Sequence, residues 1–582
     1  MKRPNIVFVL TDDQGYGDLG CHGNNIIKTP CIDNFYNESV RLKDFHVGPT
    51  CAPTRAGLMT GHYANSTGVW HTIGGRSLLR QDEWTIADAL KENGYETGIF
   101  GKWHLGDTYP YRPSDRGFNK SIIHKGGGVG QTPDYWGNDY FDDTYYDDNQ
   151  PKRFSGYCTD IFYNEAMKFI EEKRDNPFFC YIACNAPHEP YNVPQKYEDI
   201  YQDDNINKDR KKFYGMISNI DENFGKLINK LEELNIIDDT ILIFMTDNGS
   251  SGGAVLDENE QVIDGYNGGF RGLKGSEYEG GHHVPFFIRY PRLGIQGGKD
   301  IDELTANIDF MPTILDLCNV EIPRNREVDG ISLKNLLTGK DITLEERYVV
   351  TDSQRVTDPI KWKQSSVMKG NWRLINGTEL YNIKNDTSQK VDVSNLYKDK
   401  VDNMRLAYDR WWDKVTGKIE QDVPILFGDN DCILTTHDTR GDGDDCAWNQ
   451  GEIRAGKRTS SYWEIEIEKD GTYELEICRW PRTHRRNICE GIDGDDIIYN
   501  KKEIHDKYEN WYTGGTSIDI EKVVIDICEK QYEIDVDNDD SSIVSNIDLV
   551  KGKTKAYIHF IDRNSRHYAA YYVYVRRLKK FD

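Results

Sequence analysis

Short runs of apolar, β-branched residues alternate with segments of helical periodicity through the first 320 residues or so of this chain. In the longest helical segment, apolar residues recur three and four positions apart, as they do on one face of a helix. This alternation predicts βαβ units, and therefore an α/β fold with a mainly parallel sheet sandwiched by helices. The expected strands are residues 6–10, 96–100, 178–183 and 240–245, and the expected helices are residues 85–93, 161–173 and 212–234.

The pattern changes after about residue 345. Strand candidates at 347–351 and 365–369, followed by a helix-like segment at 402–415, predict a small α+β subdomain that completes the first unit. Beyond about residue 427, alternating strands separated by turn signals predict a C-terminal β-sandwich. We therefore expect a large α/β domain (1–345), a small antiparallel-sheet subdomain (346–426) and a β-sandwich domain (427–582).

The net charge and the hydropathy of the chain limit the classes of partner that it can bind. The chain has 72 Lys and Arg against 97 Asp and Glu, a net charge of −25, which argues against nucleic acid and against an anionic membrane surface. No apolar run reaches the roughly 18 residues of a membrane span. The first ten residues lack the apolar region of a secretory signal. We expect a cytoplasmic location for the chain as written, and a periplasmic or secreted one if a signal was trimmed; nothing in the sequence indicates an oligomeric state.

Pairs of oxygen ligands follow two of the expected strands. Asp12 and Asp13 follow residues 6–10, and Asp247 and Asn248 follow residues 240–245. Ligands of open α/β sheets bind beyond the carboxyl ends of the strands, and adjacent buried carboxylates need a cation. Hard oxygen donors favour Ca²⁺ or Mg²⁺ over zinc or copper. Each pair alone is also typical of an ordinary strand-to-loop turn, so the predicted metal site depends on both pairs together.

A cysteine motif gives the most specific signal. Taken alone, Cys51 is either an activated thiolate at a helix start or a buried structural thiol. The string Cys51-Ala52-Pro53-Thr54-Arg55 resembles the Cys-x-Pro-x-Arg signature of type I, formylglycine-dependent sulfatases, which are arylsulfatase-like members of the alkaline phosphatase superfamily. The resemblance runs from Pro4 to about Cys318, and more loosely to about residue 415. Its other blocks, in family order, begin at Asn5, Gly101, Ala186, Thr246 and Gly272.

The resemblance implies a sulfuric ester hydrolase with an alkaline phosphatase-like fold. In such enzymes a formylglycine-generating or anaerobic sulfatase-maturing enzyme oxidises the cysteine to formylglycine, and the hydrated aldehyde attacks sulfur. Carried over to this sequence, the implied ligands of one Ca²⁺ ion are Asp12, Asp13, Cys51, Asp247 and Asn248. The implied catalytic residues are Cys51, Arg55, Lys102, His104, His188 and Lys274.

The implied roles agree with elementary chemistry. Fixed positive charge stabilises the charge that develops on a transferring sulfuryl group, and Lys102 and Lys274 would provide it. By the resemblance, Arg55 holds the formylglycine, His104 serves the proton of its hydrate, and His188, with Lys274, serves the leaving oxygen. Histidine suits proton transfer because its pKa lies near neutrality.

A second set of residues is predicted to contact substrate. These residues lie in segments that resemble substrate-side loops of the family, and aromatic and basic side chains together suit a sulfated sugar. Loop packing and surface charge account for them equally simply. Among them, His437 belongs to an element that resembles part of some bacterial sulfatases with an added β-domain. The set is His71, Arg76, His124, Lys125, Trp136 and His437.

The sequence therefore predicts removal of sulfate from a sulfated carbohydrate. Two alternatives stay open at this level: a phosphate or phosphonate monoester hydrolase of the same superfamily, and a non-catalytic carbohydrate-binding protein with an unmodified Cys51. A basic run at 479–486 is either a contact for a polyanionic chain or a solvated hairpin. Twelve cysteines at irregular spacings do not form a disulfide framework or a zinc motif.

Overall fold

A ten-stranded sheet organises the N-terminal part of the computed structural model, which describes residues 3–579 except 203–204, 341–343, 345–346, 419–420, 422, 442–444 and 495. The five strands β8, β1, β7, β3 and β4 are mutually parallel, and antiparallel neighbours flank them. In spatial order the strands are β12 (Lys299–Ala306), β2 (Val40–His46), β11 (Phe286–Arg289), β8 (Thr240–Thr246), β1 (Asn5–Thr11), β7 (Phe178–Ala183), β3 (Glu96–Lys102), β4 (Lys120–His124), β5 (Thr144–Asp147) and β6 (Gln150–Arg153).

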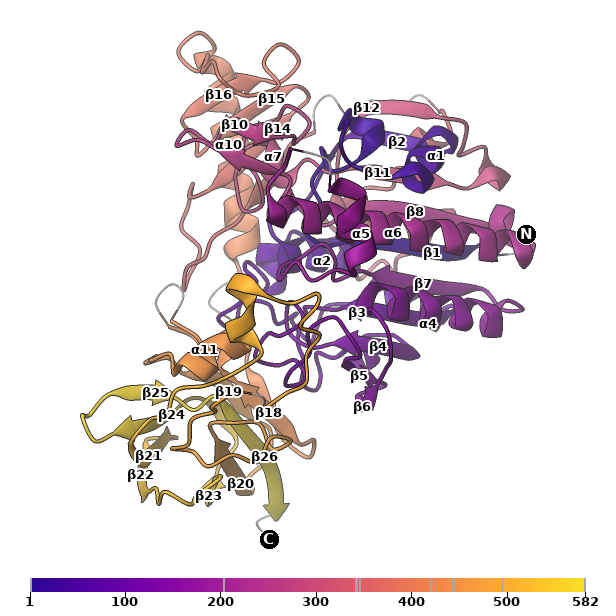
Figure 1. Cartoon of the computed structure of the whole chain (residues 1–582). Coiled ribbons are helices and arrows are strands. Elements are labelled where there is room, and N and C mark those ends of the chain that lie inside the picture. The colour runs from indigo at the N-terminus through magenta and orange to yellow at the C-terminus, as the bar shows by residue number, and fades with distance from the viewer. Residues whose placement is uncertain are drawn as a thin grey trace.

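Helices cover both faces of this sheet. Alternate residues of β1 enter opposite cores: Ile6, Phe8 and Leu10 pack on one side, and Val7 and Val9 on the other. This is the period-two geometry of a strand buried on both faces. The first core contains α2 (Cys51–Thr60), α3 (Ile86–Glu92), α8 (Phe310–Leu317) and α9 (Lys334–Leu337), and the second contains α1 (Pro30–Glu38), α4 (Cys158–Lys173), α5 (Gln195–Glu198) and α6 (Lys208–Glu233). Figure 1 shows α4 and α6 lying across one face of the sheet.

The expected α/β elements are confirmed with small shifts at their ends. The helix expected at 212–234 is α6, whose buried residues include Ile220, Phe224 and Leu227. It begins four residues earlier because the side chain of Asn207 caps it by accepting a hydrogen bond from the Arg210 N–H (2.8 Å). The helix expected at 85–93 is α3, where Thr85 and Asp88 form a capping box.

A four-stranded antiparallel sheet follows the large sheet in the chain. It comprises β13 (Val349–Asp352), β14 (Ser365–Lys369), β15 (Trp372–Ile375) and β16 (Glu379–Asn382), and α10 (Lys398–Thr416) packs on it through Met404 and Tyr408. Two short elements lie in the chain before it: the β9 (Ala254–Leu256) and β10 (Val262–Gly265) ribbon and α7 (Glu279–His282).

The C-terminal part contains two sheets that share one hydrophobic core. The first has the order β17 (Ile425–Phe427), β19 (Trp463–Ile467), β24 (Gly552–Asp562), β21 (Ile520–Ile527) and β22 (Lys530–Asp535), with β25 (His567–Ala569) paired to β24. The second has the order β18 (Cys432–Thr435), β26 (Tyr572–Lys579), β20 (Gly471–Cys478) and β23 (Ile543–Leu549), and α11 (Gln450–Ala455) lies between β18 and β19 in the chain. Because β17 begins at Ile425, the sheet includes two residues that the expected division assigns to the preceding part. The division into three domains stays a prediction.

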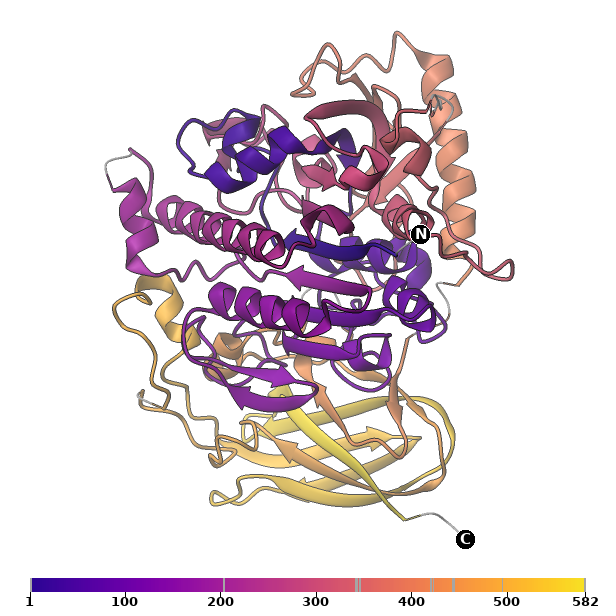
Figure 2. The same cartoon turned by 90° about the vertical axis from the view of Figure 1, so that its right-hand side faces the viewer.

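The two smaller parts lie at opposite ends of the large sheet. Figures 1 and 2 show the small antiparallel sheet beside the β12–β2 end and the C-terminal β-region beside the β4–β6 end. Side chains of the N-terminal part, among them Leu78, Tyr111 and Trp136, belong to the C-terminal hydrophobic core. None of the described helices is both long enough and apolar enough to cross a membrane.

Candidate functional site

The carboxyl ends of neighbouring parallel strands bring the motif residues together. Asp12 and Asp13 follow β1, Asp247 and Asn248 follow β8, Lys102 ends β3, and His188 follows β7. Cys51 begins α2, which follows β2. All of these residues are buried. The loop that carries Lys274 reaches the same place, since the Gly275 N–H donates to the Pro49 carbonyl (2.8 Å) just before Cys51.

Asp13 connects the ends of β1 and β8. Its N–H donates to Asp247 Oδ1 (3.0 Å), and its Oδ1 accepts from Asn248 Nδ2 (2.9 Å). Lys274 Nζ lies 2.7 Å from Asp13 Oδ2. Burial acts to raise the pKa of Asp13, but the charge of Lys274, with help from His188 and Lys102, holds it well below its usual range. Asp13 is therefore an ionised carboxylate in a buried site.

The other two carboxylates each have their own cation. Lys102 Nζ donates to Asp12 Oδ2 (2.6 Å), and Arg55 Nη2 donates to Asp247 Oδ2 (2.8 Å). Burial and the nearby Asp12 carboxylate raise the pKa of Asp247 to about 7 against the charge of Arg55. Three carboxylates thus face three cations. Without further positive charge, Asp247 is therefore only partly ionised near neutral pH.

The donor set fits a divalent cation of the Ca²⁺ or Mg²⁺ type. Two buried oxygens, Asp12 Oδ1 and Asn248 Oδ1, have no hydrogen-bond partner among the described residues. Carboxylate oxygens of Asp12 and Asp247 lie within 4.8 Å of each other and of Cys51 Sγ. Clustered oxygen donors with unfilled valence are what a hard cation requires. A bound ion would satisfy both orphaned oxygens and favour the ionised form of Asp247.

Cys51 is a poor nucleophile as a thiol. Its side chain is buried, and burial raises its thiol pKa to about 12 in spite of the nearby ammonium groups of Lys102 and Lys274. The thiolate, and not the thiol, is the reactive form of cysteine. An unmodified Cys51 would therefore remain protonated and inert near neutral pH, although it lies at the centre of the charged cluster.

Two histidines beside the cluster have one ring nitrogen fixed by a backbone carbonyl. Nε2 of His104 donates to the Thr72 carbonyl (2.8 Å), and Nδ1 of His188 donates to the Glu189 carbonyl (2.6 Å). The other nitrogen of His188, Nε2, lies 3.7 Å from Asp13 Oδ2. Burial lowers the pKa of His104 well below its usual value and that of His188 to about 4. Both rings are therefore neutral in this state, with His104 Nδ1 and His188 Nε2 able to accept a proton.

The predicted substrate-contacting residues fall into two groups. Near the charged cluster, the ring of His437 lies 6.2 Å from that of His104. The buried His124 has a pKa lowered to about 3 by burial, against its hydrogen bond to the Lys125 carbonyl and with contributions from Lys102 and Arg55. His71 accepts a hydrogen bond from Arg355 (3.4 Å).

The second group lies away from the cluster. Lys125 and Trp136 line a separate cavity, and Trp136 packs on Trp480, with 5.6 Å between ring centroids. Arg76 stacks on Trp70, with Cζ 4.9 Å from the ring centroid. The structure therefore places Trp136 and Lys125 in the separate cavity, whereas Arg76 lies beside His71 and Arg355.

Two contributors were missed by the sequence analysis. The Thr72 carbonyl selects the tautomer of His104, and Arg355, in the loop after β13, reaches His71. A backbone carbonyl leaves no signal in a sequence, and Arg355 lies in no recognisable motif. The basic run at 479–486 is mixed: Arg479 is buried against backbone carbonyls and Arg486 pairs with Glu490 (2.8 Å), whereas Arg482 and Arg485 are exposed.

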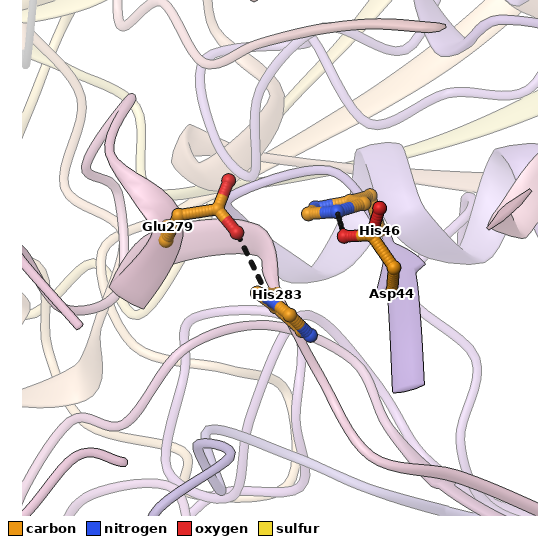
Figure 3. A group of neighbouring side chains, drawn as sticks. All are labelled: Asp44, His46, Glu279 and His283. Carbon is orange, nitrogen blue, oxygen red and sulfur yellow. Dashed lines mark hydrogen bonds and ion pairs between the residues drawn. The ribbon is translucent and has the colours of Figure 1, made fainter. Parts of the chain in front are cut away.

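A buried ion-pair network anchors the segment that follows Lys274. Figure 3 shows Glu279 and His283 on one side and Asp44 and His46 on the other. Arg373 of β15 joins them, since its Nε donates to Glu279 Oε1 (2.7 Å) and its Nη2 donates to Asp44 Oδ1 (2.6 Å). Although these four residues offer ligand atoms close enough for a metal, the guanidinium already forms an ion pair with each carboxylate. The small sheet thereby holds the chain five residues beyond Lys274.

We predict that Arg373→Met lowers the free energy of unfolding by about 3–5 kcal/mol, because it leaves the buried Glu279 and the half-buried Asp44 without the guanidinium that pairs with both. Urea denaturation measures this. A triple variant that also carries Asp44→Asn and Glu279→Gln should recover part of the loss. Arg576→Met, which breaks an exposed pair with Glu474, should cost less than about 1 kcal/mol. A loss for Arg373→Met no larger than this control would contradict the anchoring role.

Comparison with known proteins places this geometry in a family context. The family model described as Sulfatase matches residues 4–320, and that described as N-sulphoglucosamine sulphohydrolase, C-terminal, matches residues 274–407. Arylsulfatase J of Mus musculus is 30% identical over 440 residues, which covers 70% of this chain and 69% of that protein. The ulvan-active sulfatase of Formosa agariphila is 29% identical over 379 residues, covering 60% and 68%. The crystal structure of Ps i-CgsB in complex with k-i-k-neocarrahexaose superposes with a TM-score of 0.64 at 28% identity, over 72% of this chain and 94% of that one.

Proposed function

This chain belongs to the sulfatase family and is an enzyme that hydrolyses sulfate esters, and from this premise we propose that it removes sulfate from a sulfated carbohydrate. Two relatives support the substrate class: one is by name active on ulvan, and the other was crystallised with a neocarrahexaose. The membership sets aside the alternative of a non-catalytic carbohydrate-binding protein.

The observation that carries the proposal is the cluster of three carboxylates and three cations around Cys51. Two-metal phosphatases need ligands for a second ion. Here Lys102 and Lys274 are hydrogen-bonded to Asp12 and Asp13, so fixed ammonium groups occupy the space that a second ion would need. One metal ion with two lysines favours a sulfate ester over a phosphate monoester as the substrate.

Two groups absent from the polypeptide complete the proposed site. Oxidation of Cys51 by a formylglycine-generating or anaerobic sulfatase-maturing enzyme would supply a hydrated aldehyde, a nucleophile that the protonated thiol cannot replace. A Ca²⁺ ion held by Asp12, Asp13, Asp247, Asn248 and residue 51 would supply positive charge beside the sulfate oxygens.

The basic residues of the chain hold the sulfate and residue 51 in position. Arg55 is fixed by Asp247 and by the Lys102 carbonyl, which accepts from its Nη1 (3.0 Å). It therefore orients the side chain at position 51 without moving. Lys102 and Lys274 face the same space and oppose the negative charge of the sulfuryl group as it is transferred. Because all three cations are anchored before substrate binds, little reorganisation is needed during the reaction.

The two histidines transfer protons to or from two different groups, the nucleophile at position 51 and the leaving oxygen. His104, with Nδ1 unprotonated and unpartnered among the described residues, accepts a proton from the group at position 51. His188 protonates the leaving oxygen together with Lys274. Since burial holds the pKa of His188 below its usual value, the negative charge of a bound sulfate ester is needed to raise that pKa before His188 can act as an acid.

The central test compares aryl sulfate and aryl phosphate turnover by protein coexpressed with a maturing enzyme. We predict faster sulfate turnover, accompanied by a mass decrease in the Cys51 peptide that corresponds to replacing sulfur and two hydrogens by oxygen. Cys51→Ala should abolish turnover. Faster phosphate hydrolysis, or full activity with an unaltered thiol, would reject the proposed reaction.

We predict that Ca²⁺ raises the thermal melting temperature of the purified protein and that a chelator reverses the rise, because a ligand that binds only the folded state stabilises it. Asp247→Asn should lose most of this response, since it removes one carboxylate ligand while keeping the side-chain shape. Asp526→Asn, on an exposed position of β21, should keep the full response. An unchanged Ca²⁺ response in Asp247→Asn would argue against this ligand set.

We predict that His188→Ala lowers turnover of a sugar sulfate by about 10²-fold or more, the usual contribution of general acid catalysis. Turnover of 4-nitrophenyl sulfate should fall by less, because its leaving group needs no proton. His567→Ala, at an exposed position, serves as the control. Equal losses on both substrates would contradict a role in protonating the leaving oxygen.

A further inference from the structure

A cavity of about 370 Å³ lies between the N-terminal part and the C-terminal β-region. Segments from both sides line it, at residues 107–151 and 431–574. This volume falls within the range of small-molecule sites in proteins. Its walls carry six aromatic side chains: Tyr109, Tyr135, Trp136, Tyr146, Tyr572 and Tyr574. Such rings offer flat faces and hydroxyl groups, the combination that packs against a sugar ring.

One of the three basic residues in this cavity has no carboxylate partner among the described residues. Arg112 is paired with Asp115 (2.7 Å) and Arg482 with Glu476 (2.6 Å). Lys125 instead has its ammonium over the ring of Tyr146, 4.3 Å from the centroid, and burial lowers its pKa. The carboxyl groups of Asp107 and Asp134 are near enough to favour the charged form of Lys125, but neither forms an ion pair with it in the described part of the chain. A partly desolvated ammonium in this position can pair with an anionic group of a ligand.

The acidic residues of the cavity hydrogen-bond to other groups or are exposed. Burial raises the pKa of Asp134 well above its usual value, and its oxygens accept hydrogen bonds from Asn138 and from the Gly130 N–H. Burial also raises the pKa of Asp107, which accepts from the Gly126 N–H (3.0 Å). Asp438 accepts from His437, and Asp431 is exposed. Asp107 and Asp438 can accept hydrogen bonds from sugar hydroxyls.

The cavity adjoins the catalytic site. His437 Nδ1 lies 3.0 Å from Oδ1 of Asp438, which lines the cavity, and the His437 ring lies 6.2 Å from that of His104. On the other side of the cavity, Asp107 accepts a hydrogen bond from the Gly126 N–H. The next residue, Gly127, lies directly against His104, since a Cβ placed at Gly127 would be 2.3 Å from His104 Cε1. One layer of residues therefore separates the cavity from the histidine that contacts the reacting groups.

We propose that this cavity binds a second sulfated sugar unit of the glycan whose target sulfate ester occupies the charged cluster. The non-target sulfate faces Lys125, and the sugar ring packs on the tyrosines, Tyr574 among them. The inference rests on the proposed function and deepens it: the substrate is an oligosaccharide or polysaccharide with sulfate on more than one unit. A protein of net charge −25 with a single unpaired lysine here does not suit a longer, more densely charged polyanion.

The test measures binding to Cys51→Ser protein, which cannot turn over. Titration calorimetry is run with sulfated tetrasaccharides prepared from carrageenan, ulvan and chondroitin sulfate, each with and without its non-target sulfate. We expect Lys125→Gln to weaken binding of the best doubly sulfated tetrasaccharide about tenfold and to leave binding of its monosulfated counterpart within twofold. Tyr574→Ala should weaken both about three- to tenfold, whereas Tyr557→Ala, at a half-buried tyrosine of β24 outside the cavity, should change neither.

Equal losses for both ligands in Lys125→Gln, no loss in either cavity variant, or no binding by any tetrasaccharide would overturn the proposal. Melting temperatures of the variants within about 3 °C of the parent confirm that a loss of binding is not a loss of folding. Turnover of 4-nitrophenyl sulfate by the matured wild-type enzyme tests the proposed reaction separately, so a failure of the cavity and a failure of the reaction are distinguishable.

Discussion

The mutual repulsion of three buried carboxylates is the constraint on which the rest of this structure depends. Asp12, Asp13 and Asp247 meet because β1 and β8 are adjacent and parallel and end at the same level. Buried charges of one sign are tolerated only when each is paired. The three cations that pair with them come from three different parts of the chain: Lys102 from β3, Arg55 from α2 and Lys274 from the loop before α7. Charge balance therefore fixes the α2 start, the β3 end and the Lys274 loop around one point, and that point contains Cys51.

The small antiparallel sheet supports the charged cluster through a second set of ion pairs. Lys274 can neutralise Asp13 only if its loop is held, and the loop is held by Arg373, which pairs with Glu279 beyond the lysine and with Asp44 on β2. The second matching family model begins at residue 274 and ends at 407, so it spans both the loop and the sheet. The loop and the sheet are thus one physical unit: separating them would leave both carboxylates without the guanidinium that pairs with them.

Much of the fold and the charged cluster was predictable because each depends on short-range or strand-end rules. The periodicity of α6 and the apolar run of β1 define buried elements, and the rule that parallel strands present their carboxyl ends at one edge brings Asp13 and Asp247 together. The outer residues were not predictable in this way. His124 and Lys125 are consecutive, but β4 ends at His124 and the chain bends at Lys125. His124 therefore faces the cluster while Lys125 lines the separate cavity. Trp136 packs on Trp480, more than 340 positions later, a pairing that no local pattern encodes.

The C-terminal β-region packs against the N-terminal part, although it lies beyond both matched family models, which end at residues 320 and 407. Leu78, Tyr111 and Trp136 of the N-terminal part share its hydrophobic core, so removing the region would expose these apolar side chains to water, at a cost of about 25 cal/mol per Å². The same packing brings His437 beside His104. Since His104 and His437 are both buried, the position of the β-region determines the shape of the space around His104. Under the proposed function, variation in this region would change which glycan is accepted without altering the charged cluster.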